Sequence, residues 1–154
     1  MCSKAQDDME EWNCRDEVEE ETRNTAPVTR NVENWQPPLH LWLKCNTDGA
    51  WDHNREHCGV GWVLRDHHGD VKWMGARRLL KLRNHIEVEA EALRWAVMMM
   101  VKLNYTNVVF ETDCKGLIQT LQDTKSNPSI LAYTQNIHNL LTKIGPHQVV
   151  FKSR

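Results

Sequence analysis

The sequence of 154 residues lacks several features that would define its class. It has no apolar run of membrane length, no charged-then-apolar leader and no low-complexity tract, which argues against membrane, secreted and fibrous proteins. Its five cysteines are odd in number and have no CxxC spacing, so we expect no disulfide framework. We therefore expect an intracellular protein of the nucleus or cytoplasm, monomeric and without a membrane partner.

Charge is divided unevenly along the chain. Residues 1–36 contain ten acids and four bases, whereas residues 37–154 contain 11 acids and 15 bases. The acidic segment has too few apolar side chains to order itself, and Pro37 and Pro38 favour an extended entry to the folded part. We expect a disordered segment over 1–36 and one domain over 37–154, whose modest positive charge permits a polyanionic partner.

Strand patterns dominate the first half of that domain. Residues 39–47 suit a pleated surface and stop at the turn dipeptide Asp48-Gly49, which predicts a strand that ends there. Residues 59–65 and 71–76 predict two more strands. Because only a short Gly- and Asp-containing segment, 66–70, separates these two, we expect them to be antiparallel.

Helices and two further strands follow. Apolar residues at helical spacing predict a long, well-buried helix over 86–103 and another over 130–144, with a short helix over 115–122. Residues 108–113 and 148–151 predict strands. The resulting order βββαβααβ indicates an α/β fold with a mixed five-stranded sheet and helices packed on it.

Three carboxylates stand out in this arrangement. Asp48 and Asp113 each close a predicted strand, at the positions where sheet proteins place their sites. Glu89 heads the apolar stripe of the long helix, so burying it needs a cation or hydrogen bonds. Glu87 and Glu91 are expected on the opposite, solvated side of that helix.

Three converging acids would repel one another unless a multivalent cation held them ionised. Oxygen ligands favour Mg²⁺ or Mn²⁺ over Zn²⁺, and open metal positions favour phosphoryl chemistry on nucleic acid. Each acid also has a structural explanation: Asp48 as a turn residue, Asp113 as a helix cap, Glu89 as part of a fraying first turn. A plain α/β domain with no metal therefore remains an alternative.

Four motifs occur in order: KCNTDGAW at 44–51, CGVGWVLRDHHG at 58–69, VEAEALRWA at 88–96 and VVFETDC at 108–114. Together they resemble the ribonuclease H type-1 superfamily. More closely, they resemble plant RNase H-like domains related to the last domain of non-LTR retrotransposon reverse transcriptases, over about residues 35–151.

The resemblance implies that Asp48, Glu89 and Asp113 are catalytic residues and metal ligands. Glu89 is preferred to Glu91 because the family's Trp stands six positions after the catalytic acid, and here that residue is Trp95. The implied activity is endonucleolytic hydrolysis of the RNA strand of an RNA/DNA hybrid by two Mg²⁺ ions, with Mn²⁺ as a substitute. One ion would activate water and the other would stabilise the leaving 3′ oxygen.

The sequence departs from the family pattern at its end. Family members usually add a fourth acid from a helix after the last strand, but this sequence stops at Lys152-Ser153-Arg154. We therefore expect a C-terminally truncated RNase H-like domain in which that helix is missing. The alternative function is a catalytically inactive nucleic-acid-binding or interaction module derived from a retroelement.

Arg77 and Arg78 are candidates for substrate contact, because they begin a basic run that is expected in a loop beside the acids. A tryptophan on each of the first three strands, Trp42, Trp62 and Trp73, is expected to pack rather than to stack on bases. A zinc site built from His53, His57, Cys58 and Cys45 matches no common zinc spacing.

Overall fold

The computed structural model describes residues 35–123 and 128–153. The predicted acidic segment therefore lies, up to residue 34, outside the described residues. The elements in chain order are β1 Leu43–Ala50, β2 His57–Arg65, β3 Val71–Leu80, α3 His85–Lys102, β4 Val108–Thr112, α4 Lys115–Gln122, the 3-10 turn η1 Pro128–Ile130, α5 Leu131–Leu141 and β5 His147–Phe151.

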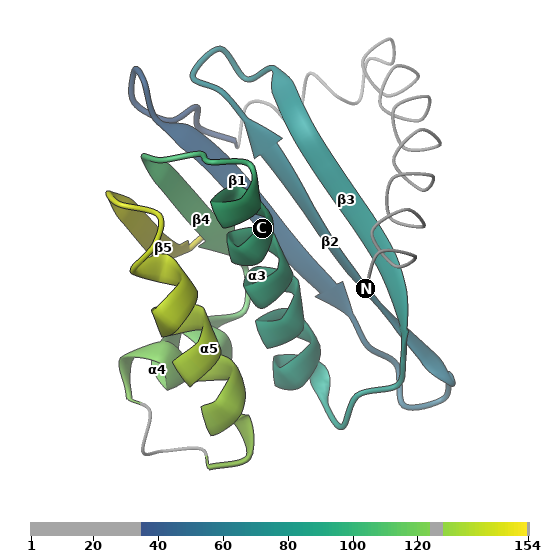
Figure 1. Ribbon diagram of the computed structural model, residues 1–154. Coiled ribbons are helices and arrows are strands. Elements are labelled where there is room, and N and C mark those ends of the chain that lie inside the picture. The colour runs from purple at the N-terminus through teal and green to yellow at the C-terminus, as the bar shows by residue number, and fades with distance from the viewer. Residues whose placement is uncertain (1–34, 124–127, 154) are drawn as a thin grey trace, which may run out of the picture.

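The five strands form one mixed sheet in the order β3-β2-β1-β4-β5. The first three strands are antiparallel neighbours, whereas β4 is parallel to β1 and β5 is parallel to β4. α3 and α5 lie on one face of the sheet, as Figure 1 shows. This arrangement confirms the predicted α/β fold with a mixed five-stranded sheet, its first three strands antiparallel, and helices packed on it.

The core lies between the sheet and α3. Strand β2 alternates strictly between buried and half-buried residues, so that Cys58, Val60, Trp62 and Leu64 all point toward the helix. α3 contacts β1, β2 and β4 on one side and α5 on the other, which explains why most of its residues are buried. The side chain of Asn84 begins the helix by accepting the Glu87 N–H at 2.9 Å.

The prediction for the first strand was wrong at both ends. Residues 39–42 form a turn, with Leu41 at φ 70° and the Trp42 N–H bonded to the Leu39 carbonyl, so Trp42 is not on a strand. At the other end, β1 continues through Asp48 and Gly49, which pair with Gly61 and Val60 of β2. The long antiparallel ladder with β2 outweighs the turn preference of Asp48-Gly49.

The third strand is longer than predicted. It continues to Leu80 because its second half pairs with His57, Cys58 and Gly59 at the start of β2. Arg77 and Arg78 therefore lie on a strand, not in a loop, and their side chains point to opposite faces of the sheet.

A glycine on β3 allows the largest core side chains to pack. A Cβ at Gly75 would lie 2.7 Å from Trp62 Nε1 and 2.9 Å from Trp95 Cη2. These two indole rings meet edge to face, with centroids 5.8 Å apart. Trp62 and the half-buried Trp73 belong to the packed core, as expected for tryptophans on these strands.

Within 35–123 and 128–153, every helix is too short or too polar to cross a membrane.

Candidate metal centre

Three carboxylates that are far apart in sequence meet at one point. Asp48 lies on β1, Glu89 on α3 and Asp113 directly after β4. One carboxylate oxygen from each lies within 4.8 Å of the others. Their surroundings differ, because Asp48 is exposed, Asp113 is half-buried and Glu89 is fully buried.

The parallel pairing of β1 with β4 brings the two aspartates together. The last pair in this ladder joins Asn46 to Glu111. Asp48 and Asp113 each follow two residues later, and a period of two returns side chains to the same face. The two acids therefore lie side by side where the paired strands end.

Glu89 reaches the aspartates because α3 passes very close to β1. The Gly49 N–H donates a hydrogen bond to Glu89 Oε1 at 3.1 Å. A Cβ at Gly49 would lie 2.8 Å from Val88 Cγ1 and 3.1 Å from the Glu89 nitrogen, so only glycine fits there without displacing the helix. The glycine next to Asp48 thus positions the third acid.

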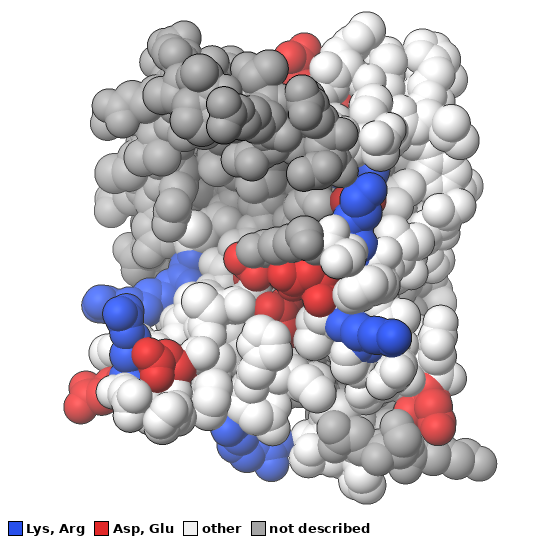
Figure 2. Space-filling view, turned by 180° about the vertical axis from the view of Figure 1, so that it is seen from behind, with Lys and Arg blue, Asp and Glu red and all other residues white. Residues whose placement is uncertain are grey.

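The neighbouring groups reflect the negative charge of this site. His85 Nε2, one helical turn before Glu89, lies 3.7 Å from Glu89 Oε1. Burial raises the pKa of the Cys114 thiol, and the charges of Glu89 and Asp113 raise it further. Figure 2 shows acidic atoms gathered in the middle of the sheet face opposite α3 and α5, with Lys and Arg side chains on either side.

The donor set fits a hard divalent cation. It consists only of carboxylate oxygens, which Mg²⁺ and Mn²⁺ prefer over the nitrogen and sulfur ligands typical of zinc. Two oxygens on opposite sides of one Mg²⁺ are about 4 Å apart, close to the 4.8 Å limit found here. Three such oxygens from three elements can therefore converge on a divalent ion with small side-chain adjustments.

A buried polar cluster behind the aspartates escaped the sequence analysis. Lys44 Nζ lies 2.9 Å from Glu111 Oε2, and the Asn46 side-chain amide donates to Glu111 Oε1 at 2.9 Å. Trp35 Nε1 donates to Asn46 Oδ1 at 3.2 Å. The sequence carried a signal for it, since Asn46-Thr47-Asp48 and Glu111-Thr112-Asp113 repeat the same Thr-Asp ending on two strands.

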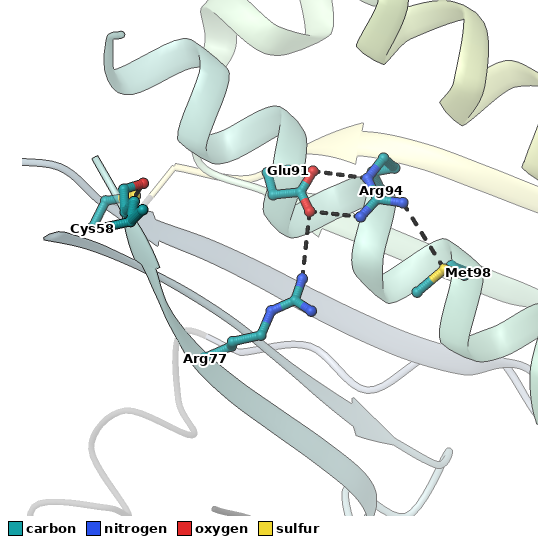
Figure 3. Close-up of polar contacts among 6 residues, drawn as sticks. Cys58, Arg77, Glu91, Arg94 and Met98 are labelled. Carbon is teal, nitrogen blue, oxygen red and sulfur yellow. Dashed lines mark hydrogen bonds and ion pairs between the residues drawn. The ribbon is translucent and has the colours of Figure 1, made fainter. Parts of the chain in front are cut away.

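Glu87 and Glu91 are not solvated, contrary to the prediction. Only 7% of Glu87 and 8% of Glu91 is exposed, because cationic side chains cover the helix face that carries them. Glu91 accepts two hydrogen bonds from Arg94, at 2.6 and 2.7 Å, and lies 3.4 Å from Arg77 Nη2. Figure 3 shows Arg77 reaching from β3 toward Glu91, with Arg94 and Met98 farther along α3.

The two candidate substrate arginines have different environments. Arg77 is held against Glu91 and over the Trp95 ring, 4.5 Å from its centroid, with only 10% of its side chain exposed. Arg78 is exposed and shares the hollow on the open face of the sheet with Asp48. Of the two, Arg78 is therefore the one that an external phosphate can reach.

The acids are the single group of three or more metal-ligating side chains found among residues 35–123 and 128–153. The residues considered for zinc, His53, His57, Cys58 and Cys45, do not form such a group there. Cys45 and Cys58 are buried as free thiols, and Cys58 Sγ contacts the Leu80 carbonyl at 3.6 Å.

Comparisons with solved structures identify the fold. RNase H1 of Halobacterium salinarum superposes with a TM-score of 0.66 at 19% identity, covering 73% of this chain and 86% of that one. The N-terminal RNase H domain of a Mycobacterium tuberculosis protein gives 0.64 at 16% identity, covering 73% and 82%. An RNase H1 obtained from compost by a metagenomic approach was solved with an RNA/DNA hybrid, and it gives 0.57 at 19%, covering 73% and 86%.

A search of curated proteins found no match to this chain. A family model, in contrast, covers most of it. The model of the reverse transcriptase-like family matches residues 46–154, a range that contains all three acids. The chain therefore belongs to the reverse transcriptase-like family and folds as an RNase H-like domain.

Proposed function

We propose that this protein is an RNA/DNA-hybrid ribonuclease that hydrolyses the RNA strand endonucleolytically with Mg²⁺, or with Mn²⁺ in its place. One observation carries the proposal: in an RNase H-like domain, Asp48, Glu89 and Asp113 come from three elements to within 4.8 Å. We further propose that the domain derives from a retroelement and acts without a membrane partner.

The three acids have different tasks in this proposal. Glu89 is buried and fixed by the Gly49 N–H, so it is the rigid ligand at the base of the site. Asp48 is exposed on the open side, where a phosphodiester and a water molecule can approach. Asp113 is half-buried, intermediate in exposure between the other two acids. When bound, two Mg²⁺ ions would activate the attacking water and stabilise the leaving 3′ oxygen.

Substrate contact rests on charge and exposure. The hollow beside Asp48 is lined in part by Gly59, Gly61 and Ala76, where a missing side chain or a single methyl group leaves the sheet surface accessible. The exposed Arg78 also lines this surface and provides a cation for a phosphate. Discrimination of RNA would depend on 2′-hydroxyl contacts and on backbone shape more than on base sequence.

The test is cleavage of a hybrid with a labelled RNA strand, with duplex DNA and duplex RNA as parallel substrates. We expect Mg²⁺-dependent cutting within the RNA strand of the hybrid alone, leaving 5′-phosphate and 3′-hydroxyl ends. Binding of the hybrid by folded protein without cutting in either Mg²⁺ or Mn²⁺ would refute the ribonuclease and favour the inactive binding module.

A further inference from the structure

We infer that Asn46 and Glu111 are positioning residues whose hydrogen bond sets the separation of Asp48 and Asp113. The inference rests on the proposed metal-binding function of these acids. The backbone pairing of β1 with β4 ends at the pair Asn46–Glu111. We call this point the fork, and the segments that follow it, 47–50 and 112–113, its arms.

Beyond the fork, the two arms are held by different neighbours. Asp48 pairs with Gly61 of β2 on one side. Thr112, just before Asp113, pairs with Phe151 of β5, and its carbonyl accepts the Lys152 N–H at 2.9 Å. The distance between the aspartates therefore depends on what links the arms near the point where they separate.

In addition to the backbone pairing at this position, a side-chain hydrogen bond links the two strands. Asn46 donates to Glu111 Oε1 at 2.9 Å, directly across the last paired position. A second contact, from the Thr47 hydroxyl to the Glu111 carbonyl, is at the 3.5 Å limit of a hydrogen bond and is correspondingly weak.

Burial makes this link rigid. Glu111 is 7% exposed and Lys44 8%, and their ion pair at 2.9 Å fixes Glu111 Oε2 while Oε1 faces Asn46. Lys44 also donates to the Gln36 carbonyl. A carboxylate held at both oxygens cannot change its rotamer without losing an ion pair inside the protein, so the fork has one preferred opening.

Metal selectivity distinguishes this role from general structural support. Mg²⁺ requires near-octahedral geometry at about 2.1 Å, whereas Ca²⁺ accepts flexible geometry at about 2.3–2.6 Å. A fork that opens should therefore weaken Mg²⁺ binding more than Ca²⁺ binding. A variant that merely loosens the fold would weaken both by similar factors.

The experiment is calorimetric titration of the full chain with Mg²⁺ and with Ca²⁺. For Asn46→Ala, which keeps the Lys44–Glu111 pair, we expect about a tenfold loss of Mg²⁺ affinity, in the range known for residues behind metal ligands, and a clearly smaller loss for Ca²⁺. Glu111→Gln keeps an acceptor for Asn46. It removes the ion pair with Lys44 that fixes Oε2, so it should also weaken Mg²⁺ binding more than Ca²⁺ binding, by a smaller factor than Asn46→Ala.

Trp35→Phe is the matched control, because it removes the bond from Trp35 to Asn46 while keeping an aromatic ring beside Lys44 and leaving the Asn46–Glu111 bond in place. We expect unchanged affinities for both ions in this variant. Asn46→Ala with an unchanged Mg²⁺ to Ca²⁺ ratio would overturn the positioning role while leaving the metal site intact. Failure of the unmodified protein to bind either ion would instead overturn the proposed function together with this inference.

Discussion

Gly49 and Glu89 are joined by a hydrogen bond of 3.1 Å from the backbone N–H of β1 to the buried carboxylate of α3. The contact connects the strand that carries Asp48 to the helix that carries Glu89. It exists because residue 49 has no side chain, so the helix can approach the strand closely. The position of Glu89 relative to Asp48 thus depends on residue 49 being a glycine.

Gly49→Ala should therefore separate β1 from α3. The new Cβ would meet Val88 Cγ1 at 2.8 Å, and we expect a loss of about 1–3 kcal/mol in the free energy of unfolding, together with weaker Mg²⁺ binding. Gly59→Ala is the control, because its Cβ would have no neighbour within 4 Å. Urea unfolding should leave Gly59→Ala within about 0.5 kcal/mol of the unmodified protein; equal losses in both variants would refute the steric explanation.

Glu89→Gln should make the metal-free protein more stable. The change removes a buried charge beside two other carboxylates, while the amide oxygen can still accept the Gly49 N–H, so we expect a gain of about 1–2 kcal/mol.

The same variant should no longer respond to Mg²⁺. The unmodified protein should gain about 2.7 kcal/mol at a Mg²⁺ concentration one hundred times the dissociation constant. Urea unfolding with and without Mg²⁺ measures both effects. A Glu89→Gln protein that is stabilised by Mg²⁺ as much as the unmodified chain would show that Glu89 is not a ligand.

Arg77→Ala should lower the stability of the fold, whereas Arg78→Ala should weaken binding of the RNA/DNA hybrid. Arg77 forms an ion pair with Glu91 and lies over Trp95, so its loss should lower stability by about 3 kcal/mol, as expected for a largely buried pair that loses one partner. Arg78 is exposed, so its loss should spare stability and weaken hybrid binding. The slope of log affinity against log salt concentration should fall in magnitude by about one, as expected for the loss of one phosphate contact. Thermal unfolding and hybrid binding at several salt concentrations separate the two; reversed results would refute the assignment.

Acid should destabilise the loop between β2 and β3 through Asp66. Burial raises the pKa of this carboxyl, but the N–H groups of Asp70 and His68, which it accepts at 3.0 and 2.9 Å, bring it below its usual value. A folded-state pKa below the unfolded one contributes stability above the ordinary carboxyl range, which is lost as pH falls below about 3.9.

Asp66→Asn tests this pH dependence. The variant should be less stable than the unmodified protein at pH 7, and the difference should shrink as pH falls through the carboxyl range. Unfolding curves at several pH values measure this difference directly. A difference that stays constant with pH would show that the Asp66 charge contributes nothing to the loop.

The sequence was most informative where one pattern had one physical solution. The apolar stripe over 86–103 predicted a well-buried helix, and the position of Glu89 at the head of that stripe predicted its burial. Strand ends were predicted less well, because pairing with β2 extends β1 beyond a turn-forming dipeptide.

Contacts between distant segments were the part that local patterns could not supply. The burial of Glu91 depends on Arg77 from β3, which a helical wheel does not contain. The Asn46–Glu111 bond depends on the parallel register of two strands that are separated by 65 residues in sequence. Only the repeated Thr-Asp ending hinted at that register.

The most direct test compares the single-turnover cleavage rate of an RNA/DNA hybrid in Mg²⁺ for the unmodified protein, Asp48→Asn and Asp52→Asn. Asp52 is a half-exposed aspartate just beyond β1 and is not one of the three converging acids. We expect Asp48→Asn to lose at least about a hundredfold, because metal-based stabilisation of the transition state amounts to several kcal/mol. Asp52→Asn should retain the full rate; equal rates in all three proteins would contradict catalysis by the three carboxylates.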